Sequence, residues 1–397
     1  MSVNTMSFED ASAILNNIRQ QVTGEASLAP VNTAEFVAVG TTLLQAGYDP
    51  ILNAITQMVT KTIFSVRPYN RKFGGLKVDS EKWGAIVRKL AVVDKPFEEN
   101  QEFNLVDGQA IDHYIVNKPD VLELKFYGAE HFQKSYTIFK DQLNNAFRGP
   151  DEFGRFMSMV VQNISDMIEQ NFESIARMII ANFVGGRIAY ESDESNTPTG
   201  SIIHLLTEYK EETGVELTNV TVYAPTNFPN FIKWMYAKVA TLTSMMTERS
   251  IKYQINVEDK AITRHTPFAN QKVYLYAKLL NDMNARVLAD TYHYDFIKYA
   301  DVEAVNYWQS IDSPMDVTVK PNYLAEDGTV VEAAEASEIT DLVGVIFDEE
   351  AFGYTVMNEW SATTPLNAAG GYWNTFFHYL MRWWTDYTEK GIILLLD

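Results

Sequence analysis

Residues 150–185 carry an apolar pattern with the period of an α-helix. Pro150 suits the first turn of a helix and Asp151 favours its positive end, while Gly185-Gly186 is expected to close it. At about 1.5 Å per residue the rod would be roughly 50 Å long. Most helices are about 11–12 residues long, so this one is predicted to be an unusually long structural helix, which we name the beam. Its apolar positions recur every three or four residues: Phe153, Phe156, Met157, Val160, Val161, Ile164, Met167, Ile168, Phe172, Ile175, Met178, Ile179 and Phe183.

Shorter amphipathic patterns precede the beam. They predict helices over 7–23, 33–46 and 49–60, the last opened by Asp49-Pro50 as cap and first turn. These segments hold too little apolar mass for a core of their own. We therefore expect them to lie along something larger, such as a neighbouring subunit.

Between these helices and the beam the pattern changes to that of strands. Residues 84–93 and 121–127 are strand candidates, and the second alternates cleanly, with Leu122 and Leu124 on one face and Glu123 on the other. The segment between them is polar and broken by proline and glycine. Strand following strand without a full helix predicts a long, protruding β-hairpin.

The rest of the chain alternates between strand and helix patterns, which is typical of a compact α/β or α+β domain. The apolar run that ends the sequence must form a buried strand, because it would otherwise be an exposed aggregation edge. The polar stretch 315–341 is expected to be loop-like. The predicted strands are 132–139, 220–224, 273–279, 302–308 and 343–347, and the predicted helices are 140–147, 202–212 and 227–248.

Composition narrows the class of protein. With 46% hydrophobic and 13% aromatic residues among 397, the chain folds and is rich in residues that favour interfaces. It has no cysteine, which excludes disulfides and zinc–thiolate sites. The net charge of −20 argues against a basic footprint for phosphate binding. Neither a signal peptide nor an apolar run of about 18 residues is evident, so a soluble protein made in a cytoplasm is expected.

Charge is distributed unevenly along the chain. Residues 61–89 hold eight basic residues against Asp79 and Glu81, whereas residues 321–381 hold no Lys or Arg. One interpretation is two solvated faces; the other is that the basic hairpin of one copy docks on an acidic surface of another, with charge setting the register. The candidate contacts are Arg67, Arg71, Lys72, Lys77, Arg88 and Lys89 on the basic side, with Asp348, Glu349 and Glu350 on the acidic side.

Catalytic patterns are missing from the sequence. The six histidines have no metal-ligand spacing, and there is neither a G-x-S-x-G elbow nor a Walker A loop. Gly74-Gly75-Leu76-Lys77 lacks the spacing for a phosphate cradle, and Asp348-Glu349-Glu350 has no partner motif and is interpreted as a solvated turn. We therefore predict a protein that is not an enzyme, with no cofactor and no metal.

The order of elements and the C-terminal segment carry a family resemblance. That segment contains Gly344–Asp348, Thr364–Asn367, Gly371–Asn374, His378, Arg382, Asp386 and Glu389–Leu396. The chain resembles the major capsid proteins of tailed bacteriophages with the HK97-type α+β fold. The resemblance implies an N-terminal arm (1–60), an extended hairpin or E-loop (61–127), a peripheral domain with the spine helix (128–195, helix 150–185), an axial domain (196–345) and a returning C-terminal segment (346–397).

The resemblance also implies a function. Copies would self-assemble into hexamers and pentamers of an icosahedral shell around double-stranded DNA, in a virion assembled in the host cytoplasm and without a membrane. A separate scaffolding protein and a portal are the expected partners, and an acidic wall would not grip the DNA. A cross-link through Lys72 or Lys77 is not expected, since no carboxylate in a dry pocket can be located for it. Another virion subunit, such as a tail tube or portal, and an acidic cytoplasmic α+β enzyme are the alternatives.

Overall fold

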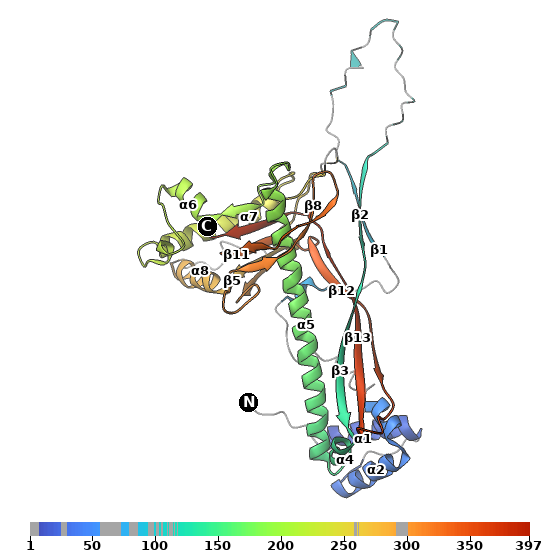
Figure 1. Cartoon of the computed structure of the whole chain (residues 1–397). Helices are drawn as coiled ribbons and strands as arrows, with labels where there is room; N and C mark the ends of the chain where they lie inside the picture. Colours follow the sequence, from blue (N-terminus) through green and yellow to red (C-terminus); the bar gives the residue numbers. More distant parts are fainter. Residues whose placement is uncertain are drawn as a thin grey trace. The chain divides into compact units, whose positions relative to one another are not determined.

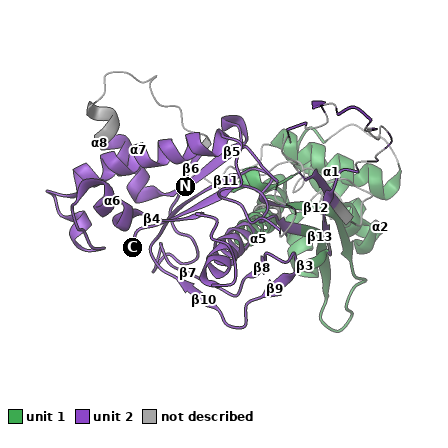
Figure 2. Cartoon of the chain, turned by 90° about the horizontal axis from the view of Figure 1, so that it is seen from above, with its two compact units in different colours: residues 1–83, 129–175, 354–382 green, residues 84–128, 176–353, 383–397 purple. Residues whose placement is uncertain are grey.

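The chain is described from a computed structural model (Figure 1). Its described residues are 8–24, 30–55, 73–78, 86–93, 99–100, 103–104, 106–108, 110, 114, 116, 118–257, 260, 262–290 and 301–397. The chain divides into two compact units (Figure 2). Unit 1 comprises residues 1–83, 129–175 and 354–382, and unit 2 comprises 84–128, 176–353 and 383–397.

The predicted beam is helix α5 (Pro150–Ser192), a single helix of 43 residues that continues from unit 1 into unit 2 after Ile175. Pro150 begins it and two acids stand in its first turn, as expected. The prediction that Gly185-Gly186 ends it is wrong. Both glycines lie inside the helix. Position 186 needs a glycine because a neighbouring side chain approaches closely: a Cβ there would lie 2.1 Å from the Tyr387 hydroxyl. Close packing here outweighs the roughly 1 kcal/mol that a mid-helix glycine costs.

Unit 1 contains the predicted N-terminal helices α1 (Phe8–Thr23) and α2 (Thr33–Ala46). Asn32 caps α2, since its Oδ1 accepts from the Glu35 backbone N–H at 2.9 Å. Residues 48–55 are also helical, and the remainder of the helix predicted over 49–60 lies outside the described residues. The Phe36 and Phe147 rings pack on Phe153 near the start of α5, so the N-terminal helices share the core of unit 1.

A three-stranded sheet completes unit 1, with the order β12 (Phe352–Thr363), β13 (Tyr372–Thr385), β3 (Glu130–Phe139). The predicted strand 132–139 and helix 140–147 are confirmed as β3 and α4 (Lys140–Ala146). β12 and β13 were not predicted. Residues along β13 alternate between buried and half-buried, and Tyr379 meets Phe172 of α5 edge-on at 5.7 Å. The sheet therefore packs one face on the beam.

The predicted hairpin is present in unit 2. β1 (Ile86–Val92) pairs antiparallel with β2 (Val121–Tyr127), in a register that places Leu90 opposite Glu123 and Val92 opposite Val121. The first part of the predicted hairpin in the sequence, around residues 61–72, lies outside the described residues. Lys77 belongs instead to unit 1, where it forms a parallel bridge with Tyr354.

The core of unit 2 is a five-stranded mixed sheet covered by helices. Its strand order is β4 (Ile202–His204), β14 (Gly391–Leu395), β11 (Leu342–Asp348), β5 (Gln271–Tyr276), β6 (Asp301–Val305). Every residue of β11 and β14 is buried, which confirms the predicted buried final strand and the predicted strand 343–347. The helices α6 (Leu205–Thr213), α7 (Phe228–Thr247) and α8 (Ala277–Asp290) contribute to the same apolar core.

Several local predictions in unit 2 need correction. Residues 220–224 form no strand but the short 3₁₀ turn η3 (Thr221–Tyr223), and 202–212 opens with β4 before α6 begins. The strand predicted over 273–279 ends at Tyr276, where α8 takes over. The predicted loop 315–341 contains the short strands β7 (Val317–Val319), β8 (Asn322–Leu324), β9 (Val330–Glu332) and β10 (Ser337–Ile339). Strands of three residues are set by their pairing partners, because such runs are too short to show periodicity.

Candidate functional site

The turn between β13 and β14, residues 386–390, is a polar feature of unit 2 with many hydrogen bonds and ion pairs. All five of its residues are buried, although four of them are polar or charged. Asp386 shapes the turn, since its Oδ1 accepts from the backbone N–H of Thr388 at 2.9 Å and from its hydroxyl at 2.6 Å. Buried polar groups need partners, and the partners of this turn come from distant parts of the chain.

Arg187 of α5 holds the backbone of the turn. Its guanidinium donates to the carbonyl oxygens of Tyr387 (3.3 Å) and Glu389 (2.6 Å). It also donates to the Tyr253 carbonyl at 3.0 Å and to the Ser201 hydroxyl at 2.7 Å. The side chain is 1% exposed. A buried cation with four oxygen acceptors thus fixes where the side chains of the turn point.

Tyr387 locks the turn against the beam. Its hydroxyl lies 3.0 Å from the Asn182 carbonyl oxygen and 2.5 Å from that of Asn322. Its ring stacks parallel to that of Phe183 at 5.9 Å. Burial raises the pKa of this phenol, so it remains a neutral donor. Tyr387 has this position because Gly186 leaves the space for it.

Lys89 of the hairpin reaches into this turn. Its Nζ lies 2.9 Å from Glu350 and 3.1 Å from Asp386, and it also contacts Glu389. Arg264 contacts Glu389 as well and donates to the Thr388 hydroxyl at 3.2 Å. We name Lys89, Arg264, Glu350, Asp386 and Glu389 the hairpin-base cluster.

Burial shapes the electrostatics of the cluster. It opposes the charge of Lys89, but Asp386, Glu389 and Glu350 outweigh that effect and hold the lysine pKa above its ordinary 10.5. Burial also raises the pKa of Glu389, against the opposing influence of Lys89 and Arg264. The lysine is therefore charged throughout the physiological range. Its contribution to stability is present below pH 10.5 and is lost only as the pH rises through the folded-state pKa.

The basic residues predicted for contacts between copies differ in where they lie and what they contact. Arg67, Arg71 and Lys72 lie outside the described residues. Arg88 is exposed and pairs with Glu123 across its own hairpin. Lys89, its neighbour in the strand, points to the opposite face and enters the hairpin-base cluster.

The acidic residues also differ from one another. The expectation that Asp348 belongs to a solvated turn is wrong: it is 7% exposed, its Oδ2 accepts from the Thr266 hydroxyl at 2.8 Å, and its Oδ1 accepts from the Glu350 backbone at 2.9 Å. As the last residue of β11 it serves the core. Glu349 and Glu350 are exposed. Glu350 meets Lys89 within one chain, and the use of these residues between copies stays a prediction.

Sequence reasoning missed Arg187 and Arg264, and it quoted Asp386 and Glu389 only as parts of a motif. Arg187 sits among the apolar residues of the beam and gives no signal of the carbonyls that surround it. Lys89 and Glu389 are separated by 300 positions. An arginine inside an otherwise apolar helical stripe is the one pattern that could have indicated a buried cation.

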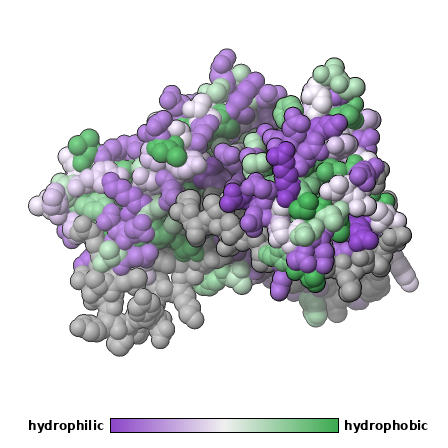
Figure 3. Space-filling model, turned by 90° about the horizontal axis from the view of Figure 1, so that it is seen from below, coloured by the Kyte–Doolittle hydropathy of each residue, from purple (hydrophilic) through white to green (hydrophobic). Residues whose placement is uncertain are grey.

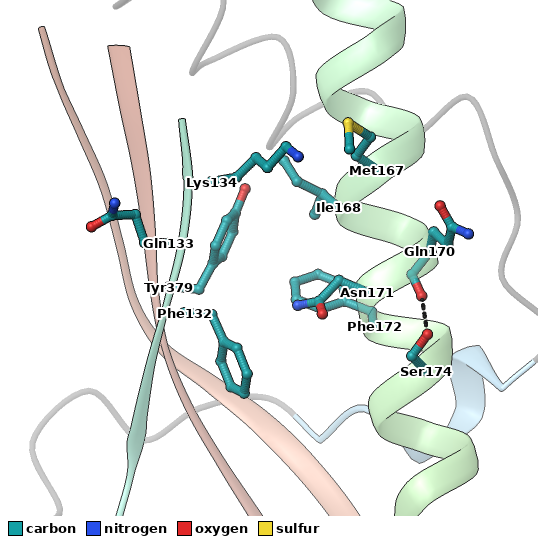
Figure 4. A pocket seen from close by; sticks show the side chains of 10 residues that line it. All are labelled: Phe132, Gln133, Lys134, Met167, Ile168, Gln170, Asn171, Phe172, Ser174 and Tyr379. Carbon is teal, nitrogen blue, oxygen red and sulfur yellow. Dashed lines mark hydrogen bonds between the residues drawn. The ribbon is translucent and has the colours of Figure 1, made fainter. Parts of the chain in front are cut away.

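Unit 1 contains a cavity of about 320 Å³ between α5 and the strands β3 and β13. The Phe132 and Tyr379 rings point into it from the sheet, Phe172 lines it from the helix, and Gln133 points away (Figure 4). The described residues that line it include Lys134 but neither an acid nor a histidine. This lining offers no general acid–base pair.

Across the described ranges, His, Asp and Glu nowhere gather in a group that could hold a metal ion. Over the same part of the chain, no helix is both long enough and apolar enough to cross a membrane.

Comparison with solved structures shows the class of the fold. The chain is 12% identical to a chain in the capsid structure of Staphylococcus phage Andhra, with a TM-score of 0.53 and coverage of 83% of this chain and 84% of that one. It is also 12% identical to a chain in a structure of the head fiber and inner core protein gp22 of bacteriophage P68, with a TM-score of 0.54 and coverage of 83% and 85%. The fold is thus the HK97-like fold of phage capsid proteins.

The family follows from the sequence itself. Residues 12–387 match the Phi29-like phage major capsid protein family, and the chain belongs to that family. Among curated proteins, none matches the sequence. The expectation of a major capsid protein is therefore confirmed, with a place in the multimeric shell of a virion.

Proposed function

We propose that copies of this chain form hexamers and pentamers that close into an icosahedral shell around double-stranded DNA. The observation that carries the proposal is the outer face of the hairpin. Leu90 is 64% exposed, Val92 60% and Val121 44%. Val92 and Val121 are direct cross-strand partners, and Leu90 lies two residues before Val92, so the three share one face. We name them the outer hairpin patch.

A two-stranded ribbon has little stability of its own, and exposed apolar side chains on it favour association. The opposite face of the ribbon carries Lys89 and the buried Leu122, so it is occupied within the chain. The outer hairpin patch is the face left for a neighbouring copy. Arg88 and Lys125, which face each other across the ribbon, add exposed charge beside it.

Replacing Leu90 and Val121 together by Asp is expected to reduce the fraction of protein in shells by about tenfold or more, because charges at a buried contact cost several times the thermal energy. Sedimentation and negative-stain microscopy of the assembled material measure this fraction. The matched control is Val220→Asp, an 83% exposed apolar residue elsewhere in unit 2. Normal shells from the Leu90/Val121 variant, with a melting temperature like that of the wild type, would contradict the role of the patch.

The partners of the shell are part of the proposal. We expect a separate scaffolding protein and a portal, and packaged DNA bound without sequence preference in a virion assembled in the host cytoplasm. The net charge of −20 supports weak contact with DNA. Apolar residues stand in separate groups among hydrophilic ones on the face seen in Figure 3. This arrangement suits several small contacts with neighbouring copies. The role is structural and not enzymatic.

A further inference from the structure

We infer that Lys89 fastens the base of the hairpin to the core of unit 2 through ion pairs with Glu350, Asp386 and Glu389. The fastening is a property of the single chain. Its consequence for the shell rests on the proposed function, since a hairpin of fixed direction presents the outer hairpin patch already oriented toward a neighbour.

The pleat of β1 separates two roles in adjacent residues. Side chains along a strand alternate between faces, so Arg88 and Lys89 point in opposite directions. Arg88 is exposed and bonds Glu123 of the partner strand, which ties the hairpin only to itself. Lys89 is largely covered, at 22% side-chain exposure, and contacts residues from the β11–β12 connection and from the 386–390 turn.

Asp386 and Glu389 are also held by groups other than the lysine. Asp386 is held by Thr388 and Glu389 by Arg264, while Arg187 fixes the backbone on which both acids stand. Asp386 is 2% exposed and Glu389 4% exposed, so neither acid can turn out to water. Besides Lys89, the cations that act on these two acids are Arg264, by direct contact, and the buried Arg187, through the charge of its guanidinium. Two cations therefore face the three acids Glu350, Asp386 and Glu389, and the cation from the hairpin balances the remaining negative charge.

Removing one partner from an ion pair of this kind is costly, because it leaves an uncompensated buried charge. The cluster also has geometric value. Three carboxylates around one ammonium define a single position for the strand that carries it. Pre-orienting a binding element lowers the entropy lost on association, so the hairpin meets its neighbour at lower cost when Lys89 is seated.

Hydrogen exchange in the unassembled chain tests the inference, at a concentration where it sediments as a monomer. In Lys89→Met, amides of 86–92 and 121–127 are expected to exchange roughly tenfold faster or more than in the wild type. Lys89→Arg is expected to keep most of the protection. Arg88→Met is the matched control: it removes the neighbouring cation of the same strand, and protection should change less than about twofold.

The variant Lys89→Met also leaves buried acids unbalanced, so amides of β11 and β14 report separately on the core. The double variant Lys89→Met/Glu389→Gln removes one acid together with the lysine. We expect it to restore protection of β11 and β14 while the hairpin stays fast. Recovery of the hairpin together with the core would overturn the inference, and so would unchanged hairpin exchange in Lys89→Met. Failure of the wild-type chain to form shells, while Lys89→Met still shows the faster hairpin exchange, would count against the proposed function instead, because exchange is measured before assembly.

Discussion

Replacing Arg187 by Met is expected to lower the free energy of unfolding by about 3–5 kcal/mol, because it leaves several buried oxygen acceptors without a donor. The methionine nearly fills the volume but donates nothing. The carbonyls of Tyr253, Tyr387 and Glu389 would lose their guanidinium donor at a site that is 1% exposed. We expect a large fall in the urea concentration at the midpoint of unfolding, measured by circular dichroism.

Arg155→Met is the control for this prediction. Arg155 lies on the same helix, but its side chain is 65% exposed and its ion pair with Glu152 spans 3.7 Å. Exposed pairs contribute about 0–1 kcal/mol, so the midpoint should scarcely move. Equal midpoints for the Arg155 and Arg187 variants would show that the buried guanidinium does not hold the turn.

Gly186→Ala is expected to destabilise the chain by about 1–3 kcal/mol, although alanine normally stabilises a helix relative to glycine by roughly 1 kcal/mol. The added Cβ would lie 2.1 Å from the Tyr387 hydroxyl oxygen and 2.5 Å from Cζ of the ring. The ring cannot retreat easily, because Asn182 and Asn322 hold its hydroxyl and Phe183 stacks on it. Thermal unfolding measures the difference.

Gly149→Ala provides the comparison, since a Cβ there meets nothing within 4 Å. We expect that variant to be as stable as the wild type or slightly more so, through the reduced entropy of its unfolded chain. If Gly186→Ala were also stabilising, the close approach of Tyr387 to the beam would be refuted.

The long periodic elements could be predicted from the sequence. The beam could be predicted because its apolar stripe repeats over about eight turns, and β2 could be predicted because Leu122 and Glu123 begin a clean alternation. β13 escaped detection for the opposite reason. Tyr372 and Phe376 lie on one face while Trp373 and Phe377 lie on the other, so large aromatic residues occupy both faces. A strand of that kind shows no apolar–polar period.

The hairpin-base cluster could be predicted only in part. The contrast between the basic hairpin and the acidic segment was visible in the sequence, and Lys89 and Glu350 do meet. That they meet within one chain depends on the fold, since β1 must present Lys89 to a turn some 300 positions later. Arg187 could not be assigned at all, because three of its four acceptors are backbone carbonyls, which no side-chain pattern reveals.

The central claim is that this major capsid protein closes into a shell, and microscopy tests it most directly. The chain would be produced alone and together with its scaffolding candidate, separated by size-exclusion chromatography with light scattering, and viewed by negative stain. We expect pentamers, hexamers or closed shells. A stable monomer or small dimer under every salt condition, with and without the scaffold, would contradict the account.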